Sequence, residues 1–220
     1  MAAGAAYPGT MPRPDRDGRY HHGDLRSALI DTAIEIIAER GVRGFSLAEA
    51  SRRLGVASSA PYAHFADRDD FLAAVAVHGY DLFNTRFLPE MNRFPDPAER
   101  LAAIAAAYVR FAGAHRPLFE VIFVAGFDKV RHPEVKAAEK PFEDAYTDII
   151  HTLEPESGDP AGEDGDLAAA VEAAAYGHAM LLLEGDYGEG DEAVELAAER
   201  AGRATLALVE SRHLLRKQAP

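Results

Sequence analysis

The sequence predicts an all-α protein with an N-terminal three-helix head and a larger helical body, about nine helices in all. Three observations support this prediction. Apolar residues recur at helical spacing in most segments between residues 24 and 216. A capped helix, a glycine turn and a polar second helix follow one another within Phe45–Phe65. Near the C-terminus, 167–185 and 191–216 read as two consecutive helices.

The first predicted helix covers residues 24–40. Asp24 suits the N-cap position, and Gly41 suits the stop. Its buried stripe is expected to consist of Leu25, Leu29, Ala33, Ile36 and Ile37.

The next helix begins after Ser46 and ends at Gly55. Ser46 and Glu49 have the spacing of a capping box, in which each side chain bonds to a backbone N–H of the other residue. Glycine adopts the left-handed conformation that commonly ends a helix.

A second short helix is expected to start near Ser58 or Ser59, either of which can cap it. Pro61 lacks an N–H and is tolerated only in a first helical turn. This helix carries Tyr62 and His64. Two short helices around a glycine turn describe a helix-turn-helix, whose second helix enters the DNA major groove.

The segments HHGDLRSALIDTAIEIIAERG, FSLAEASRRLGV and APYAHFADRDDFLAAV resemble the N-terminal half of a TetR-type transcriptional regulator. YHHGDLR and APYAHFADRDDFL are most similar to the branch whose C-terminal region is called the WHG domain. The resemblance implies an all-helical homodimer, usually a repressor, with a DNA-binding head and a ligand-binding body. This chain departs from the pattern at Ser51, where alanine is usual, at Ala57, where a capping serine is usual, and at Tyr176–His178, which lacks the signature tryptophan.

The predicted DNA-binding residues are polar or basic groups of the head and its N-terminal arm: Arg19, His21, His22, Arg43, Ser46, Ser58, Ser59, Tyr62, His64 and Arg68. Arg68 stands where the family usually has a phosphate-binding lysine. The alternatives are a solvated arm for 19–22, packing within the head for Tyr62, and a bond to a neighbouring loop for His64.

The charge distribution favours an approach to DNA through the head. The whole chain carries −13, but residues 19–68 carry +1 and residues 69–220 carry −14. An acidic body repels the duplex and leaves only the head to approach it.

The domains are expected to be a disordered tail over 1–18, the helix-turn-helix domain over 19–66 and the body over 67–217. The tail lacks the apolar stretch of a signal peptide, which predicts a cytoplasmic protein without a membrane partner. Body helices are predicted over 68–92, 97–114, 117–125 and 133–153, the last interrupted before Pro141. An acidic loop near 154–166, expected to be mobile, precedes the last two helices.

A small-molecule pocket is predicted from aromatic and polar residues of the body: Phe83, Phe87, Met91, Tyr108, Phe111, His115, Phe119, Phe123, Phe127, Tyr146, Tyr176, His178 and Met180. Such residues at helical spacing also suit a filled core. A mostly apolar lining favours a hydrophobic or aromatic effector, and no charged residue stands out to indicate an anion or a cation.

The last two helices, 167–185 and 191–216, are the predicted homodimer interface, because a monomer cannot bury both faces of the first one. No metal site, cofactor or catalytic residue is predicted, since the chain has no cysteine, no HExxH pattern and no phosphate loop. Two other functions remain open: an interaction module whose head has lost DNA binding, and a helical enzyme.

Overall fold

The computed structural model describes residues 22–124, 128–155 and 166–215, without the side chains of 22–24, 87, 90 and 129. These residues form eight α-helices and five short 3-10 or π turns, with no strand among them, which confirms the all-α prediction. The helices are α1 His22–Arg40, α2 Leu47–Leu54, α3 Arg68–Met91, α4 Pro97–Ala114, α5 Arg116–Phe119, α6 Pro133–Leu153, α7 Asp166–Glu184 and α8 Asp191–Glu210. The short turns are η1 Val42–Gly44, η2 Ala60–Ala63, η3 Glu120–Val124, η4 Lys129–Arg131 and η5 Arg212–Leu214. The tail over 1–18 and most of the acidic loop lie outside the described residues.

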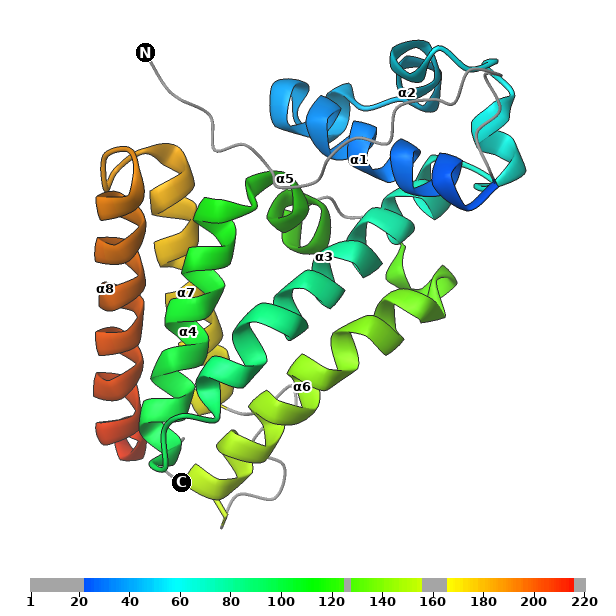
Figure 1. The fold of residues 1–220 in the computed structure, drawn as a ribbon. Coiled ribbons are helices and arrows are strands. Elements are labelled where there is room, and N and C mark those ends of the chain that lie inside the picture. The colour runs from blue at the N-terminus through cyan, green and yellow to red at the C-terminus, as the bar shows by residue number, and fades with distance from the viewer. Residues whose placement is uncertain (1–21, 125–127, 156–165, 216–220) are drawn as a thin grey trace.

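A small head and a larger body are joined by one long helix. In Figure 1, α1 and α2 lie at one end of α3, which runs diagonally from the head into the body. Helices α4, α7 and α8 pack against one another, and α6 lies along α3. Helix α3 therefore belongs to both parts, so a movement of the helices packed on it can reach the head.

The start of α4 was predicted from local signals and is confirmed. Asp96 Oδ1 accepts hydrogen bonds from the N–H groups of Ala98 (2.8 Å) and Glu99 (3.1 Å), and Pro97 occupies the first turn. A proline fits there because the N–H it lacks has no partner within the helix.

Helix α6 is continuous through Pro141, so the predicted interruption is wrong. Proline in a helix interior removes one backbone hydrogen bond and crowds the carbonyls of the preceding turn. Asn84 of α3 donates its side-chain N–H to the carbonyl of Ala138 in that turn (2.8 Å). We infer that this tertiary bond helps α6 to continue.

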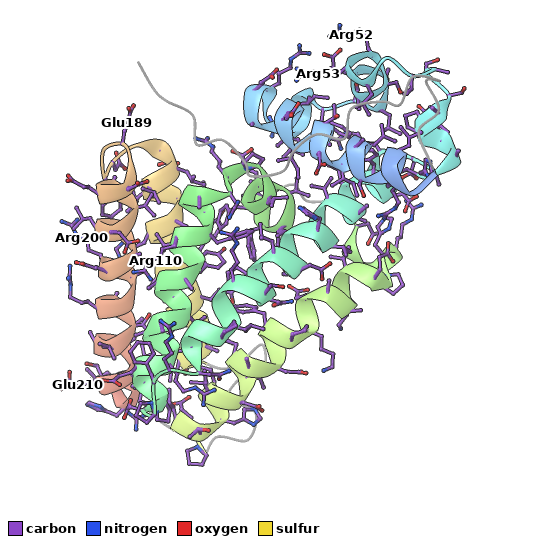
Figure 2. All side chains as sticks on the ribbon, in the orientation of Figure 1. Arg52, Arg53, Arg110, Glu189, Arg200 and Glu210 are labelled. Atoms are coloured by element: carbon purple, nitrogen blue, oxygen red, sulfur yellow. The ribbon has the colours of Figure 1, made fainter. Side chains whose placement is uncertain are left out.

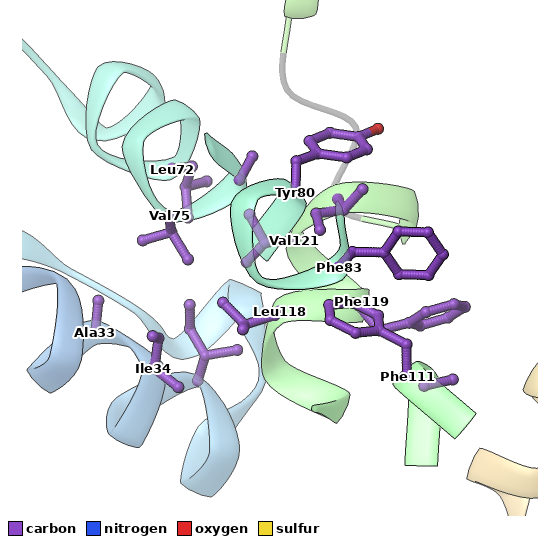
Figure 3. Packing of buried hydrophobic residues seen from close by; sticks show 14 of the residues in the cluster. Ala33, Ile34, Leu72, Val75, Tyr80, Phe83, Phe111, Leu118, Phe119 and Val121 are labelled. Carbon is purple, nitrogen blue, oxygen red and sulfur yellow. The ribbon is translucent and has the colours of Figure 1, made fainter. Parts of the chain in front are cut away.

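One hydrophobic core connects the head with the body. Figure 3 shows Ala33 and Ile34 of α1 facing Leu118 of α5, with Leu72 and Val75 of α3 beside them. All five belong to the same buried cluster, and Leu118 is fully buried. The head is thus supported by α5 as well as by α3.

Acidification from about pH 7.5 to 5.5 is expected to lower the melting temperature because of His115. Burial, with Arg86 and His78 adding to it, holds the pKa of His115 below its ordinary 6.5. As pH falls through about 6.5, His115 takes up a proton in the unfolded chain but stays neutral in the folded chain. Its contribution to the free energy of unfolding is therefore fully present above pH 6.5 and is lost as pH falls below it.

Thermal unfolding at three pH values across this range measures the decline, and His115→Gln is expected to flatten it. Burial also lowers the pKa of His178, which adds a slope of the same sign. Carboxylates with lowered pKa values contribute only in more acidic solution. A decline as steep in His115→Gln as in the wild type would contradict the assignment.

Candidate DNA-binding and ligand-binding sites

The start and the end of α2 confirm the predicted cap and stop. Ser46 Oγ accepts a hydrogen bond from the N–H of Glu49 (3.3 Å). At the other end, Gly55 has φ 68°, its N–H donates to the carbonyl of Arg52 (3.3 Å), and Val56 N–H donates to that of Ser51 (3.1 Å). This pair of bonds is the Schellman arrangement, which requires a left-handed residue.

The second half of the predicted capping box is wrong, because Glu49 is engaged elsewhere. Its carboxylate accepts from Arg52 (2.7 and 2.9 Å) and from Arg53 (3.3 Å). These bonds, with that of Arg52 first, lower the pKa of Glu49 to about 2. Arg53 also pairs with Glu39 of α1, so the two helices of the head are tied together.

The second helix of the motif is shorter than predicted. It is the single 3-10 turn η2, and no side chain of its N-cap residue Ser59 caps it. The expected serine cap is therefore wrong for Ser59. The turn is held instead by Pro61, which is buried and whose carbonyl accepts from the N–H groups of His64 and Phe65 (2.9 Å each). Buried Phe65 then packs on Phe71 of α3, with ring centroids 4.2 Å apart.

The predicted DNA contacts that the structure describes lie on the surface of the head. Tyr62 is 59% exposed, and His64 is half-buried. The exposed members are Arg43, Ser46, Ser58, Ser59, Tyr62 and Arg68. Arg68 donates to the carbonyl of Val42 (2.8 Å), which places the first turn of α3 beside the turn that carries Arg43. Arg19 and His21 lie outside the described residues, as does the side chain of His22.

Arg52 is a candidate that the sequence reasoning did not single out. Its side chain is 70% exposed, and Figure 2 shows Arg52 and Arg53 on α2 at the outer end of the head. The first helix of a helix-turn-helix crosses the DNA backbone. The signal available in the sequence was a cation on the polar face of α2.

Ser51 departs from the family pattern, but its buried hydroxyl has a hydrogen-bond partner. The residue is buried, and its hydroxyl donates to the carbonyl of Leu47 (3.0 Å). A buried hydroxyl with a partner costs little. Ser51 therefore gives no support to the alternative of a head that has lost its function.

A cavity of about 710 Å³ lies in the body among α4, α6, α7 and η3, with Val130 of η4 at its edge. Three predicted pocket residues line it: Tyr108, Phe123 and Tyr146. The remaining wall residues are Ile104, Ala105, Ile122, Val130, Lys136, Glu139, Phe142, Glu143, Val171, Glu172 and Ala175. Most of the wall is apolar, as in small-molecule sites.

The other predicted pocket residues that the structure describes lie outside this lining. Four are buried core residues: Phe83, Met91, Phe111 and Phe119. Of these, Phe119 and Phe83 stand directly behind the wall, with ring centroids 5.2 Å from those of Tyr108 and Phe142 respectively. His115, Tyr176, His178 and Met180 lie elsewhere, and His178 Nδ1 is hydrogen-bonded to Tyr187 Oη (2.5 Å). Phe127 and the side chain of Phe87 are outside the described residues.

Three carboxylates line the cavity, contrary to the expectation that no charged residue indicates the charge of the ligand. Glu139 and Glu143 of α6 and Glu172 of α7 line it, against one cation, Lys136. Glu139 also accepts a hydrogen bond from the buried hydroxyl of Tyr80 on α3 (2.6 Å). The 139, 142, 143 and 146 spacing places these α6 residues on one helix face. Only the fold shows that this face meets α4 and α7.

One group of possible metal ligands lies where α3 and α6 begin. Atoms of Asp70, His132 and Glu134 come within 4.8 Å of one another. Asp70 Oδ2 accepts from the N–H of Ala66 (2.8 Å), and His132 Nδ1 lies 3.3 Å from Glu134. These bonds already explain the cluster as structural, so it adds no metal site to the prediction.

The outer faces of α7 and α8 carry exposed apolar side chains: Tyr176, Leu181, Leu196 and Leu206. Among the described helices, α7 is the one long and apolar enough to cross a membrane by length and composition, with 33% of its apolar window buried. Length and apolarity of this kind also suit a helix at a subunit interface.

Two family models match the sequence. Residues 29–75 match the bacterial regulatory proteins of the tetR family, and residues 101–206 match the tetracyclin repressor-like C-terminal domain. The first match covers the helix-turn-helix, and the second covers the cavity wall from α4 through α7 and most of α8.

Solved structures share this fold. A protein of unknown function from Rhodococcus sp. RHA1 is 30% identical, with 84% of this chain and 96% of that chain covered and a TM-score of 0.62. AibR, in complex with isovaleryl coenzyme A and operator DNA, is 18% identical (80% and 95% covered, TM-score 0.61). FadR from Bacillus subtilis, in complex with stearoyl-CoA, is 16% identical (83% and 96% covered, TM-score 0.58). No curated protein matches the chain.

Proposed function

This chain belongs to the TetR family of transcriptional regulators, and we propose that it is a cytoplasmic repressor that binds a palindromic operator as a homodimer and is released by a small molecule. The observation that carries the proposal is the helix-turn-helix geometry of the head. A correctly capped α2, a Schellman turn and the exposed η2 segment present Ser58, Ser59 and Tyr62 to solvent.

The exposed head residues divide into two roles in this proposal. Arg43, Arg52 and Arg68 bind phosphates and fix the register of the head on the duplex. Ser58, Ser59 and Tyr62 lie on the segment that enters the major groove, where base edges are read.

The cavity supports a small-molecule effector with a hydrophobic or aromatic part. AibR and FadR were solved with acyl-CoA ligands, which combine an apolar tail with phosphates. The apolar wall of this cavity suits such a tail. Its three glutamates disfavour phosphates, so the effector of this chain differs in the charge of its polar part.

Two of the connections from the cavity to the head run through η3 and through α6. Ile122 and Phe123 of η3 line the cavity, and the preceding helix α5 packs against α1 of the head. Glu139 of α6 lines it too and is bonded to Tyr80 of α3. A ligand that favours one arrangement of these elements shifts the population of head positions. In a dimer, that shift changes the spacing of two heads that must match half-sites one DNA turn apart.

Binding of the protein to the DNA that flanks its own coding region tests the proposal, by fluorescence anisotropy over a series of salt concentrations. We expect tight binding that weakens steeply with salt, because phosphate contacts release counterions. Arg43→Ala is expected to weaken binding and to reduce the salt slope by about 1 per subunit. Tyr62→Ala is expected to reduce the preference over a random duplex.

Lys140→Ala is the matched control, because it also removes one exposed cation but lies in the body, paired with Asp144. Binding to selected random sequences extends the test to a distant operator. If no duplex is preferred and Arg43→Ala behaves like Lys140→Ala, the chain is an interaction module without DNA binding.

A further inference from the structure

We infer that the effector of the body cavity is an organic cation with an aromatic or aliphatic part, held by Glu139, Glu143 and Glu172 and by the surrounding aromatic rings. This inference rests on the proposed function, because it names the ligand class of the same cavity. It is carried by the charges and the rings that the fold brings together there.

The carboxylates come from two helices that wall the cavity. Glu139 and Glu143 lie one helical turn apart on α6, and Glu172 lies on α7. With Lys136 as the one cation in the lining, the described wall has a formal charge of −2. Three like charges around one space repel one another, and a bound cation relieves that repulsion.

The aromatic rings supply the second half of a cation site. Tyr108 and Phe123 meet edge to face with ring centroids 4.8 Å apart and an interplanar angle of 60°. Phe142 and Tyr146 are stacked with centroids 6.1 Å apart and an interplanar angle of 27°. All four line the cavity. The negative faces of aromatic rings attract ammonium groups, and cages of rings bind quaternary ammonium ligands.

The hydroxyl of Tyr146 is already used in a hydrogen bond within the protein. It donates to the backbone carbonyl of Ala168 (2.8 Å), which fixes the ring at the wall. Burial, followed by the charge of Glu172, raises the pKa of both Tyr146 and Tyr108. Of these two causes, the charge of Glu172 is the one that also attracts a cation near these rings.

Binding of an anionic ligand in the same cavity is electrostatically unfavourable. Among the described wall residues, a carboxylate or phosphate would meet three glutamates and a single lysine, and like charges repel one another. The cavity therefore selects against anions as well as for cations.

Isothermal titration with tetraphenylphosphonium and tetraphenylborate separates charge from hydrophobicity, because the two ions have nearly the same shape and opposite charge. We expect the cation to bind roughly tenfold more tightly or better, a difference that corresponds to about 1.4 kcal/mol. Glu172→Gln and Glu143→Gln are each expected to weaken cation binding by roughly threefold to tenfold. Asp144→Asn, which removes a charge next to Glu143 but outside the lining, is the matched control and is expected to change binding by less than about twofold.

Binding of the borate as tight as that of the phosphonium overturns the inference. An effect of Asp144→Asn equal to that of Glu172→Gln does so too, because it would mean general attraction to an acidic protein. Operator binding without ligand is measured on the same samples. Operator binding without cation selectivity refutes the inference and leaves the repressor intact, whereas cation selectivity without operator binding refutes only the repressor.

Discussion

Leu181→Glu is expected to convert the protein into a monomer and to weaken operator binding by roughly a hundredfold or more, because each head then binds its half-site alone. Leu181 lies on α7 and is 40% exposed in the single chain, so the substitution leaves the fold of one subunit intact. In the proposed dimer the same side chain lies in an apolar interface, where an unpaired carboxylate is costly. Light scattering after gel filtration measures the mass, and anisotropy measures the affinity.

Val124→Glu is the control for this substitution. Val124 is 49% exposed on η3, far along the chain from α7 and α8, and it receives the same charge. It is expected to remain a dimer with wild-type affinity. If Leu181→Glu remains a dimer as well, the interface lies elsewhere, and the groove of about 990 Å³ that α4 and α8 form with Arg86 and Phe94 is the next surface to change.

The dimer interface stays a prediction, and it rests on helical patterns alone. Tyr176, Leu181, Leu196 and Leu206 lie on the two helices that the sequence assigned to the dimer, and they remain exposed in the single chain. Apolar residues on every face of a helix can be recognised from the sequence of that helix alone. The same holds for the caps, since Asp96 and Ser46 act on backbone groups within three residues of themselves.

Features that depend on neighbours distant in sequence escaped prediction. Pro141 signalled an interrupted helix, but Asn84 lies more than fifty residues earlier and supplies a bond that no local pattern reveals. Ser59 signalled a cap, whereas the buried Pro61 and the packing of Phe65 on α3 shape that turn. Tertiary contacts override local propensity in both cases.

The cavity wall was predicted in part for the same reason. Tyr108, Phe123 and Tyr146 were identified as aromatic residues on apolar faces, and they line the cavity. Phe83, Phe111 and Phe119 have the same pattern but are buried in the core. Glu139, Glu143 and Glu172 read as ordinary solvated charges. Glu143 and Glu172 are indeed exposed, and only the meeting of α6 with α4 and α7 brings all three to one cavity.

Tyr80→Phe is expected to remove most of the response of operator binding to the cation. Tyr80 is 1% exposed on α3, the helix that carries the head, and its hydroxyl donates to Glu139 (2.6 Å). A cation that pairs with Glu139 competes with this bond and so alters the contact between α6 and α3. In the wild type we expect the cation to weaken operator binding by a factor within about 5–150, the usual range of allosteric coupling.

In Tyr80→Phe the ring still fills the core, but the hydrogen bond from position 80 to Glu139 is gone, so a cation at Glu139 can no longer compete with that bond. Cation binding itself is expected to persist, and its effect on operator affinity to fall toward onefold. Thermodynamic linkage supplies an internal check, because the operator must weaken cation binding by the same factor as the cation weakens operator binding. Titration of tetraphenylphosphonium with and without operator, on wild type and variant, measures both.

Tyr146→Phe separates coupling from a general loss of packing. It removes a tyrosine hydroxyl from the same cavity, but that hydroxyl bonds to Ala168 of α7 and not to α3. Coupling that survives in Tyr146→Phe and disappears in Tyr80→Phe assigns the signal to the α6–α3 contact. If Tyr80→Phe retains full coupling, the signal does not need this bond, and η3 with α5, which packs against α1 of the head, is the next route to test. Both connections start at the cavity wall and end on different helices of the head, so comparing the variants shows whether the α6–α3 contact is needed for the ligand response.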